Sequence, residues 1–164
     1  MTENRRAQAP RTRPELLVAI DGDDHPLAWS GPRPTEAPSS VVRRIRQPEL
    51  RGGIKERAAL RAGWQELGDD PADLVVALEI DVVIAEDAAT ARAELLRLGE
   101  SRFGDTVRYV GTANGLLTLI LDIYAAEVAD AVILRPLDQG QGAGSAQLIA
   151  DKVLPGLLER AAAA

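Results

Sequence analysis

The pattern of apolar and polar positions is clearest between Val107 and Leu137, where it predicts a strand, a helix of about three turns and a second strand. Thr112 precedes the helix and can accept a hydrogen bond from a free N–H group of the first turn, so we expect it to be the N-cap. The second strand, Ala131–Leu134, is continuously apolar, which is typical of a strand covered on both faces of a parallel sheet. This stretch predicts one βαβ unit around which the rest of the chain is organised.

The helix of this unit is apolar over most of its surface. Between Leu116 and Tyr124 only Thr118 and Asp122 are polar, so little of the helix is suited to face water. A helix of this kind is expected to be buried nearly all round. It predicts either a place in the core of the chain or a seam between two copies.

Further strands and helices alternate along the rest of the chain. The strongest strand pattern is Leu74–Ala85, in which Glu79 and Asp81 are the only charged residues. Gly68 and Gly99 stand where helices are expected to end, at the position after the helix that favours glycine. Additional strands are predicted at Leu16–Ile20 and Leu27–Ser30, and additional helices at Ile54–Leu67, at Ala88–Leu98 and from Ser145 onward.

A short helix is predicted between a proline-rich loop and the Gly52-Gly53 pair. Ser39 or Ser40 can cap this helix. Its apolar face would carry Val41, Val42 and Ile45, and its polar face Arg43, Arg44 and Arg46.

This alternation of strands and helices predicts an α/β protein with mainly parallel strands. The chain of 164 residues is long enough for one domain with a sizeable core, which we place at residues 15–160. Residues 1–14 are polar and lack apolar periodicity, so we expect a disordered basic tail there. Residues 161–164 are expected to fray.

Composition narrows the environment and the partners. Cysteine is absent, which excludes disulfides and thiolate metal sites and fits a reducing cytoplasm. No apolar run approaches the roughly 20 residues of a membrane span, so we expect a cytoplasmic protein without a membrane segment. Residues 47–164 carry eleven basic and nineteen acidic residues. The net charge of this part of the chain is negative, and a negative surface repels the phosphate backbone of nucleic acids. We therefore expect no nucleic-acid partner.

Three segments, in their order and spacing, resemble the C-terminal part of bacterial luciferase-like monooxygenases. They are Leu74–Ala93, the Tyr109-Val-Gly-Thr turn and Asp130–Leu137, and Lys152–Leu158 is similar to the helix that closes the chain in that family. The resemblance spans about residues 48–160. It implies a partial βα-barrel, a TIM-like half barrel, with FMN or a deazaflavin as cofactor and flavin-dependent monooxygenase or oxidoreductase chemistry.

The resemblance also implies a partner. Members of that family carry a further barrel half ahead of this part, for which this chain has no room. Half-barrel edges need to be covered, so we expect a homodimer or a fuller luciferase-like partner, contacted through the Leu116–Tyr124 helix. Asp21-Gly-Asp-Asp-His25 stands where many members have a Ser/Gly-rich turn for the flavin phosphate, and its carboxylates would repel a phosphate.

Gly111 and Thr112 form the candidate cofactor-binding site. A helix start offers free N–H groups and the positive end of the helix dipole, which together can bind an anion. The plainer interpretation is a turn and a helix cap without a ligand, and in that case the chain has no cofactor at this place.

Glu79, Asp81 and Arg135 form the candidate substrate pocket. Glu79 and Asp81 are two apart in a strand, so their side chains point to the same face. In a pocket, two such carboxylates can act as a pair with perturbed pKa values. Alternatively, they face a polar edge or pair with an arginine such as Arg135.

The acidic turn around His25 is a weaker candidate. His25, with Asp21, Asp23 and Asp24, can hold a divalent cation, but the spacing is not that of a calcium loop. We therefore expect a solvated acidic turn and no metal site.

Glycines and tryptophans supply the remaining candidates. The loop that runs from Gly140 to Ser145 lacks the lysine of a phosphate-binding loop, so we expect an ordinary loop with Ser145 capping the last helix. Trp29 and Trp64 can flank a flavin ring, with core packing as the alternative.

Two functions are compatible with these patterns. The first is a truncated luciferase-like flavin-dependent monooxygenase or oxidoreductase domain that acts as a dimer or with a partner subunit. The second is a non-catalytic α/β dimerisation or interaction module that keeps only the fold. Flavin binding separates the two.

Overall fold

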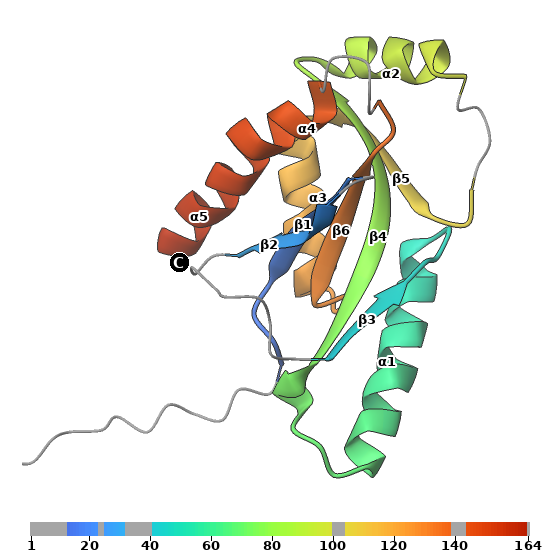
Figure 1. Cartoon of the computed structure of the whole chain (residues 1–164), viewed down its shortest axis with the longest axis vertical. Coiled ribbons are helices and arrows are strands. Elements are labelled where there is room, and N and C mark those ends of the chain that lie inside the picture. The colour runs from blue at the N-terminus through green and yellow to red at the C-terminus, as the bar shows by residue number, and fades with distance from the viewer. Residues whose placement is uncertain (1–12, 23–24, 32–40, 100–103, 139–143, 164) are drawn as a thin grey trace, which may run out of the picture.

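The structure is a computed structural model that describes residues 13–22, 25–31, 41–99, 104–138 and 144–163. These residues form one mixed sheet of six strands with helices packed around it (Figure 1). The strands are β1 (Leu17–Gly22), β2 (His25–Ser30), β3 (Val41–Ile45), β4 (Leu74–Ala85), β5 (Val107–Thr112) and β6 (Ala131–Pro136). The helices are α1 (Leu50–Glu66), the short η1 (Pro71–Asp73), α2 (Ala88–Arg97), α3 (Ala113–Ala125), α4 (Gly144–Leu148), the π-helical η2 (Ile149–Val153) and α5 (Leu154–Ala162). None of these helices is both long and apolar enough to cross a membrane.

The sheet is mostly parallel, as predicted. β1, β6, β4 and β3 lie side by side in that order and run parallel, while β2 pairs antiparallel with β1. Because β6 occupies one edge of β4, β3 and β5 share the other: β3 pairs along Leu74–Leu78 and β5 along Ile80–Ala85. The α/β class with mainly parallel strands is therefore confirmed.

The predicted strand–helix–strand unit is present as β5, α3 and β6. Thr112 is the N-cap of α3, as predicted, because its hydroxyl oxygen accepts a hydrogen bond from Gly115 N–H at 3.2 Å. The two strands of the unit are not neighbours, since β4 lies between them. In a barrel built in chain order consecutive strands are adjacent, so the order of this sheet differs from that of such a barrel.

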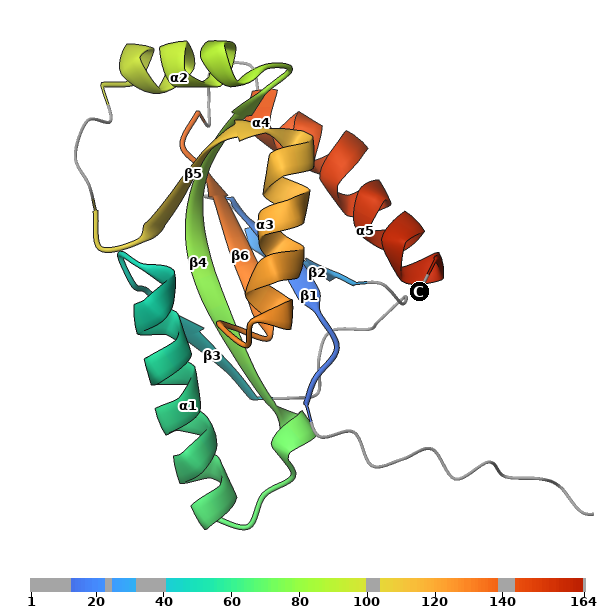
Figure 2. The same ribbon diagram turned by 180° about the vertical axis from the view of Figure 1, so that it is seen from behind.

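The two faces of the sheet carry separate apolar clusters. The larger cluster is the main core, where residues such as Leu78, Ile120 and Ile149 are fully buried between the sheet and the helices. The smaller cluster lies on the other face and consists of Leu17, Ala19, Val75, Ala77, Ala131 and Ile133. No helical residue in the described ranges belongs to it. Figure 1 shows this face toward the reader, and Figure 2 shows α3 in front of the opposite face.

The face that carries the smaller cluster is concave. Arg44 on β3 reaches Asp21 on β1 with an Nη2–Oδ2 distance of 2.9 Å, although β4 and β6 lie between these strands. In a flat sheet, three strand spacings would separate β1 from β3 by about 14 Å, which is too far for the two side chains to meet. The sheet therefore curves toward this side, as the bend of β4 in Figure 1 illustrates. We call this side the concave face.

The short helix predicted from the cap at Ser39 or Ser40 is wrong in its described part, because Val41–Ile45 is strand β3. This strand pairs in parallel register with the first half of β4. Val42 and Arg44 both face the concave side, where Val42 packs on the smaller apolar cluster. The period of two and the adjacent valines, which favour strands, were the stronger signals.

Arg13 and Pro14, the last two residues of the predicted N-terminal tail, pack against the body. The Arg13 guanidinium lies 3.8 Å from the centre of the Tyr124 ring, and the Tyr124 hydroxyl donates a hydrogen bond to the Pro14 carbonyl oxygen at 2.8 Å. Residues 1–12 lie outside the described residues. At the other end, α5 continues to Ala162 and so includes part of the segment predicted to fray.

The burial predicted for α3 holds on one side of the helix. Leu116, Leu117, Ile120 and Ile123 are buried in the main core of the same chain. Asn114, Thr118 and Asp122 are exposed. Leu119, Leu121 and Tyr124 are partly buried against the core. The side of α3 with the deepest burial is therefore occupied by this chain itself.

Candidate functional site

Charged side chains from four parts of the sheet meet on the concave face. We call this group the concave cluster, and its members are Asp21, Arg44, Arg46, Glu79, Asp81 and Arg135. The strand register brings them together: Asp81 pairs with Arg135 between β4 and β6, and Asp21 follows Ile20, whose partner on β6 is Leu134. Asp21, Arg44 and Arg135 lie near the carboxyl ends of their strands, where parallel α/β sheets bind ligands.

Glu79 is the most buried member, with a side chain only 3% exposed. Arg44 Nε donates a hydrogen bond to its Oε1 at 2.7 Å, and Arg46 Nε donates to its Oε2. Both carboxylate oxygens are therefore bonded to a cation, which offsets the cost of burying the charge. The two arginines themselves remain nearly half exposed.

Arg135 lies between three carboxylates without a hydrogen bond to any of them. Its guanidinium nitrogens lie 3.6 Å from Glu79 Oε2, 3.8 Å from Asp81 Oδ1 and 4.0 Å from Asp21 Oδ2, distances longer than a hydrogen bond. Asp81 Oδ1 is buried and has no hydrogen-bond partner among the described residues. The structure thus brings together the three residues predicted as a substrate pocket.

Burial raises the pKa of Asp81, because the desolvated carboxylate loses hydration that the neutral acid does not need. The charges of Arg135, Arg108 and Arg46 oppose this rise, and the charge of Glu79 adds to it. A carboxyl group with a perturbed pKa beside arginines is a candidate for function.

The six members of the concave cluster are three arginines and three carboxylates. Arg108 on β5 pairs in register with Asp81 and lowers the pKa of its carboxyl group.

Gly111 and Thr112 form a helix start that a tyrosine covers. Thr112 Oγ1 accepts the Gly115 N–H, and the Tyr109 hydroxyl donates a hydrogen bond to the Thr112 carbonyl oxygen at 3.2 Å. A Cβ at Gly115 would lie 2.0 Å from the Tyr109 hydroxyl, and one at Gly111 would lie 2.6 Å from it. The two glycines therefore make room for Tyr109, and the interpretation as a turn and a cap accounts for all three residues.

Trp29 and Trp64 lie on opposite faces of the sheet. Trp29 packs against the smaller apolar cluster and Trp64 against the main core. Trp64 also donates a hydrogen bond from its indole N–H to the Asp70 carbonyl oxygen at 2.8 Å. The two rings cannot flank one flavin, so this expectation is corrected.

The other weak candidates fall largely outside the described residues. This holds for Asp23, Asp24, the side chain of His25 and residues 139–143 of the glycine-rich loop. Within the described ranges, no group of three or more His, Asp or Glu side chains is placed to hold a metal ion.

Ser145 does not use its side chain to cap the last helix. Its hydroxyl oxygen accepts the Ile84 N–H at 2.9 Å, so it fastens the helix to β4. The acceptor for the Ser145 N–H is the carboxylate of Asp138, at 3.0 Å. The predicted role of Ser145 is therefore corrected.

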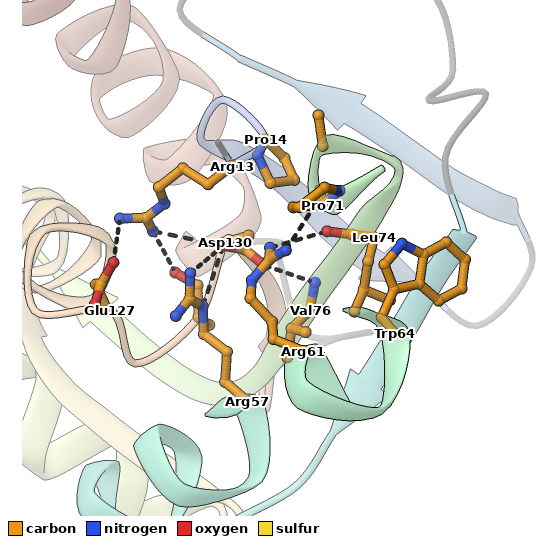
Figure 3. A network of polar contacts seen from close by, with 12 residues as sticks. Arg13, Pro14, Arg57, Arg61, Trp64, Pro71, Leu74, Val76, Glu127 and Asp130 are labelled. Atoms are coloured by element: carbon orange, nitrogen blue, oxygen red, sulfur yellow. Dashed lines mark hydrogen bonds and ion pairs between the residues drawn. The ribbon is translucent and has the colours of Figure 1, made fainter. Parts of the chain in front are cut away.

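A second group of arginines lies at the amino end of β6, around Asp130 (Figure 3). We call Asp130, Arg13, Arg57 and Arg61 the Asp130 cluster. The fully buried Asp130 accepts hydrogen bonds from Arg57 Nε and Nη2 at 3.2 and 3.1 Å and from Arg61 Nη2 at 2.5 Å. The Val76 N–H donates to it at 3.0 Å, and Arg13 Nη2 lies 3.5 Å from it. This cluster fastens α1 and the N-terminal residues to the sheet.

The Asp130 cluster and the arginines of β3 were not identified from the sequence as parts of a site. In both cases the spacing of the arginines along the sequence indicates that they share one face of their element. Arg57 and Arg61 are four apart in a helix and so share one face, together with the buried Gly53. Arg44 and Arg46 are two apart and share one face of a strand.

The geometry of the concave cluster is the basis for assigning a function. Neither a family model nor a curated protein matches this chain.

Proposed function

We propose that this chain is a cytoplasmic α/β domain that binds a small anionic ligand on its concave face. The observation that carries the proposal is Arg135, which is one-third exposed and makes no hydrogen bond in the described part of the chain. A guanidinium in this situation can bind two oxygens of a carboxylate or phosphate side by side.

The ligand that we propose is FMN or a deazaflavin, which the resemblance to luciferase-like monooxygenases implies. The curved sheet supports this proposal, because the main core lies between helices and one face while the other face is concave, as in the wall of a βα-barrel. The proposed partial barrel is rearranged, with β4 between β5 and β6.

The concave face suits a flavin better than the turn at Gly111 and Thr112 does. At the turn, the Thr112 hydroxyl and the Tyr109 hydroxyl already fill the space. On the concave face, the arginines adjoin the smaller apolar cluster, which is buried and against which Trp29 packs. We assign the phosphate to Arg135 and Arg46 and the ring to Trp29. A bound flavin would supply the hydride- or oxygen-transfer chemistry of an oxidoreductase.

Titration of the full chain with FMN, followed by flavin fluorescence, tests the proposal. We expect saturable binding that Arg135→Gln weakens about tenfold, because it removes a charge-assisted contact to the phosphate. Arg97→Gln is the matched control, since Arg97 is exposed on α2 and pairs with Glu94 at 2.5 Å, away from the concave face. Riboflavin, which lacks the phosphate, should bind more weakly than FMN. If the folded protein binds no FMN at high micromolar concentration, the flavin assignment is wrong.

A second candidate function, a dimerisation or interaction module, is favoured by the strand edges. Within the described ranges β2, β3 and β5 each pair with one strand only, and an open edge can recruit another chain. We propose that a second copy or a fuller luciferase-like partner binds at the β3 edge, because the deepest side of α3 is already buried.

Light scattering during size-exclusion chromatography tests this second candidate. A dimer that Val41→Lys converts to a monomer would support the β3 edge, where Val41 is 40% exposed. If the dimer is instead lost in the Leu121→Lys variant, the interface lies on α3. A wild-type chain that stays monomeric at every concentration would exclude the homodimer.

A further inference from the structure

We propose that Arg135 and Asp81 form a subsite for a small 2-hydroxy carboxylate, such as glycolate or lactate. This inference rests on the proposed binding of anions at the concave face, but it does not depend on a flavin. It names a ligand class for that face from the two groups whose bonding is incomplete. Because the flavin phosphate is also assigned to Arg135, the two ligands would compete for that guanidinium.

The first group is the Arg135 guanidinium, which is positioned by its strand rather than by hydrogen bonds. Its three neighbouring carboxylates lie at 3.6–4.0 Å. Glu79, the nearest of them, is already bonded through both oxygens to Arg44 and Arg46, and Asp21 is bonded to Arg44. Arg135 can therefore turn toward a ligand carboxylate without breaking a hydrogen bond within the described part of the chain.

The second group is Asp81 Oδ1, an acceptor without a donor. The atom is buried and lies 3.8 Å from Arg135 Nη1. When a ligand draws the guanidinium outward, this oxygen becomes accessible. A buried acceptor left without a hydrogen bond costs free energy, so a ligand that brings a donor relieves that cost.

The two groups together define the ligand. Arg135 requires an anionic group, and Asp81 requires an O–H donor next to it. A 2-hydroxy carboxylate carries both on adjacent carbons. A plain carboxylate adds the same negative charge as a 2-hydroxy carboxylate but leaves the Asp81 oxygen without a donor, and a neutral alcohol leaves Arg135 without an anion.

The charged groups around Asp81 give the subsite a dependence on pH. Glu79 lies beside it on β4, Arg135 faces it from β6, Arg108 from β5, and Arg46 from the end of β3. The arginines stay protonated, and burial raises the pKa of Asp81. The ionised Asp81 accepts the ligand hydroxyl, and it repels the carboxylates of glycolate and acetate alike. The preference for glycolate over acetate should therefore increase as pH rises through the pKa of Asp81.

Titration of the ¹⁵N-labelled full chain with glycolate and with acetate, followed by NMR, tests the inference. The Arg135 side-chain Nε–H and the backbone amides of β6 report binding. We expect glycolate to bind about tenfold more tightly than acetate, the size of one hydrogen bond to a charged group. Shifts that scatter over the surface, or equal affinities for the two acids, would overturn the inference.

Two variants assign the effect to the two side chains. Asp81→Asn should remove the preference for glycolate over acetate, and Arg135→Gln should weaken both ligands about tenfold. Glu94→Gln, a partly exposed acid on α2, is the control that should change neither. Circular dichroism of each variant confirms folding. A folded Asp81→Asn variant that keeps the full preference for glycolate would overturn the role of Asp81.

The same preparation separates this inference from the proposed flavin. Binding of glycolate without binding of FMN would keep the subsite and exclude the flavin. Binding of FMN without a preference for glycolate would overturn the subsite alone. If the concave face binds neither anion, both proposals are wrong.

Discussion

The two ends of β6 carry two clusters of arginines and carboxylates, and the clusters differ in how completely the acids are bonded. At the amino end, Asp130 is fully buried, and both of its oxygens accept hydrogen bonds from arginines. At the carboxyl end, Arg135 has no hydrogen bond and Asp81 Oδ1 has no donor among the described residues. The two clusters use the same residue types in different states of bonding.

This difference separates a structural cluster from a candidate site. A buried carboxylate whose oxygens all accept hydrogen bonds has no acceptor left for a ligand. Its removal destabilises the fold, because the arginines that it neutralised remain buried without a counter-charge. A cluster with an incompletely bonded acid and a half-exposed cation gains from a ligand that completes the bonding. On these grounds the Asp130 cluster is structural, and the concave cluster is the place to look for function.

Asp130→Asn should have the largest effect on stability. We expect a loss of about 3–5 kcal/mol in the free energy of unfolding, because buried arginines lose their counter-charge. Urea unfolding followed by circular dichroism measures it. The control is Glu127→Gln, since Glu127 is mostly exposed and lies 3.9 Å from Arg13; its effect should stay below about 0.5 kcal/mol. Equal, small losses in both variants would remove the distinction between the two clusters.

Glu79→Gln should cost less than Asp130→Asn, although Glu79 is also buried. The two arginines that it leaves behind are nearly half exposed and can be hydrated. We expect a loss of about 1–3 kcal/mol in the same urea experiment. Glu94→Gln on the surface of α2 is the control. A loss as large as that of Asp130→Asn would mean that the concave cluster is also primarily structural.

The sequence predicted the elements well where one physical signal dominated. Leu74–Ala85 has no competing interpretation as a helix end or loop, and Thr112 needed only the local geometry of a helix start. The prediction for residues 41–46 was wrong because a serine cap and a stripe of valines also fit a helix. Only the pairing of β3 with β4 decides between a helix and a strand.

The candidate site was predictable only in part, because its members are distant in sequence. Glu79 and Asp81 could be placed on one face from their spacing alone. Asp21 joins them through the curvature of the sheet, which no local pattern specifies. The strand order that sets β6 beside β4, and so Arg135 beside Asp81, is likewise a tertiary property.

Arg13→Gln tests how far the Asp130 cluster extends into the N-terminal residues. Arg13 donates a hydrogen bond to the Tyr124 carbonyl oxygen at 3.1 Å and stacks on the Tyr124 ring. We expect a loss of about 1–2 kcal/mol, from the stacked cation and one charge-assisted hydrogen bond. Hydrogen exchange should accelerate at the end of α3 and at the start of β1. Arg160→Gln, an exposed position on α5, should change neither quantity.

Asp81→Asn should have the smallest effect and the opposite sign. Burial raises the pKa of Asp81 above its ordinary value of 3.8, so the folded protein binds a proton that the unfolded chain releases. The stability from this proton is complete below pH 3.8 and is lost as pH rises through the higher pKa of the folded state. Asparagine has no such proton to lose. Urea unfolding at a series of pH values should therefore show the variant gaining stability over the wild type as pH rises. A variant that instead loses stability with rising pH would show that the arginines hold Asp81 ionised, which would make the concave cluster a second structural cluster like that of Asp130.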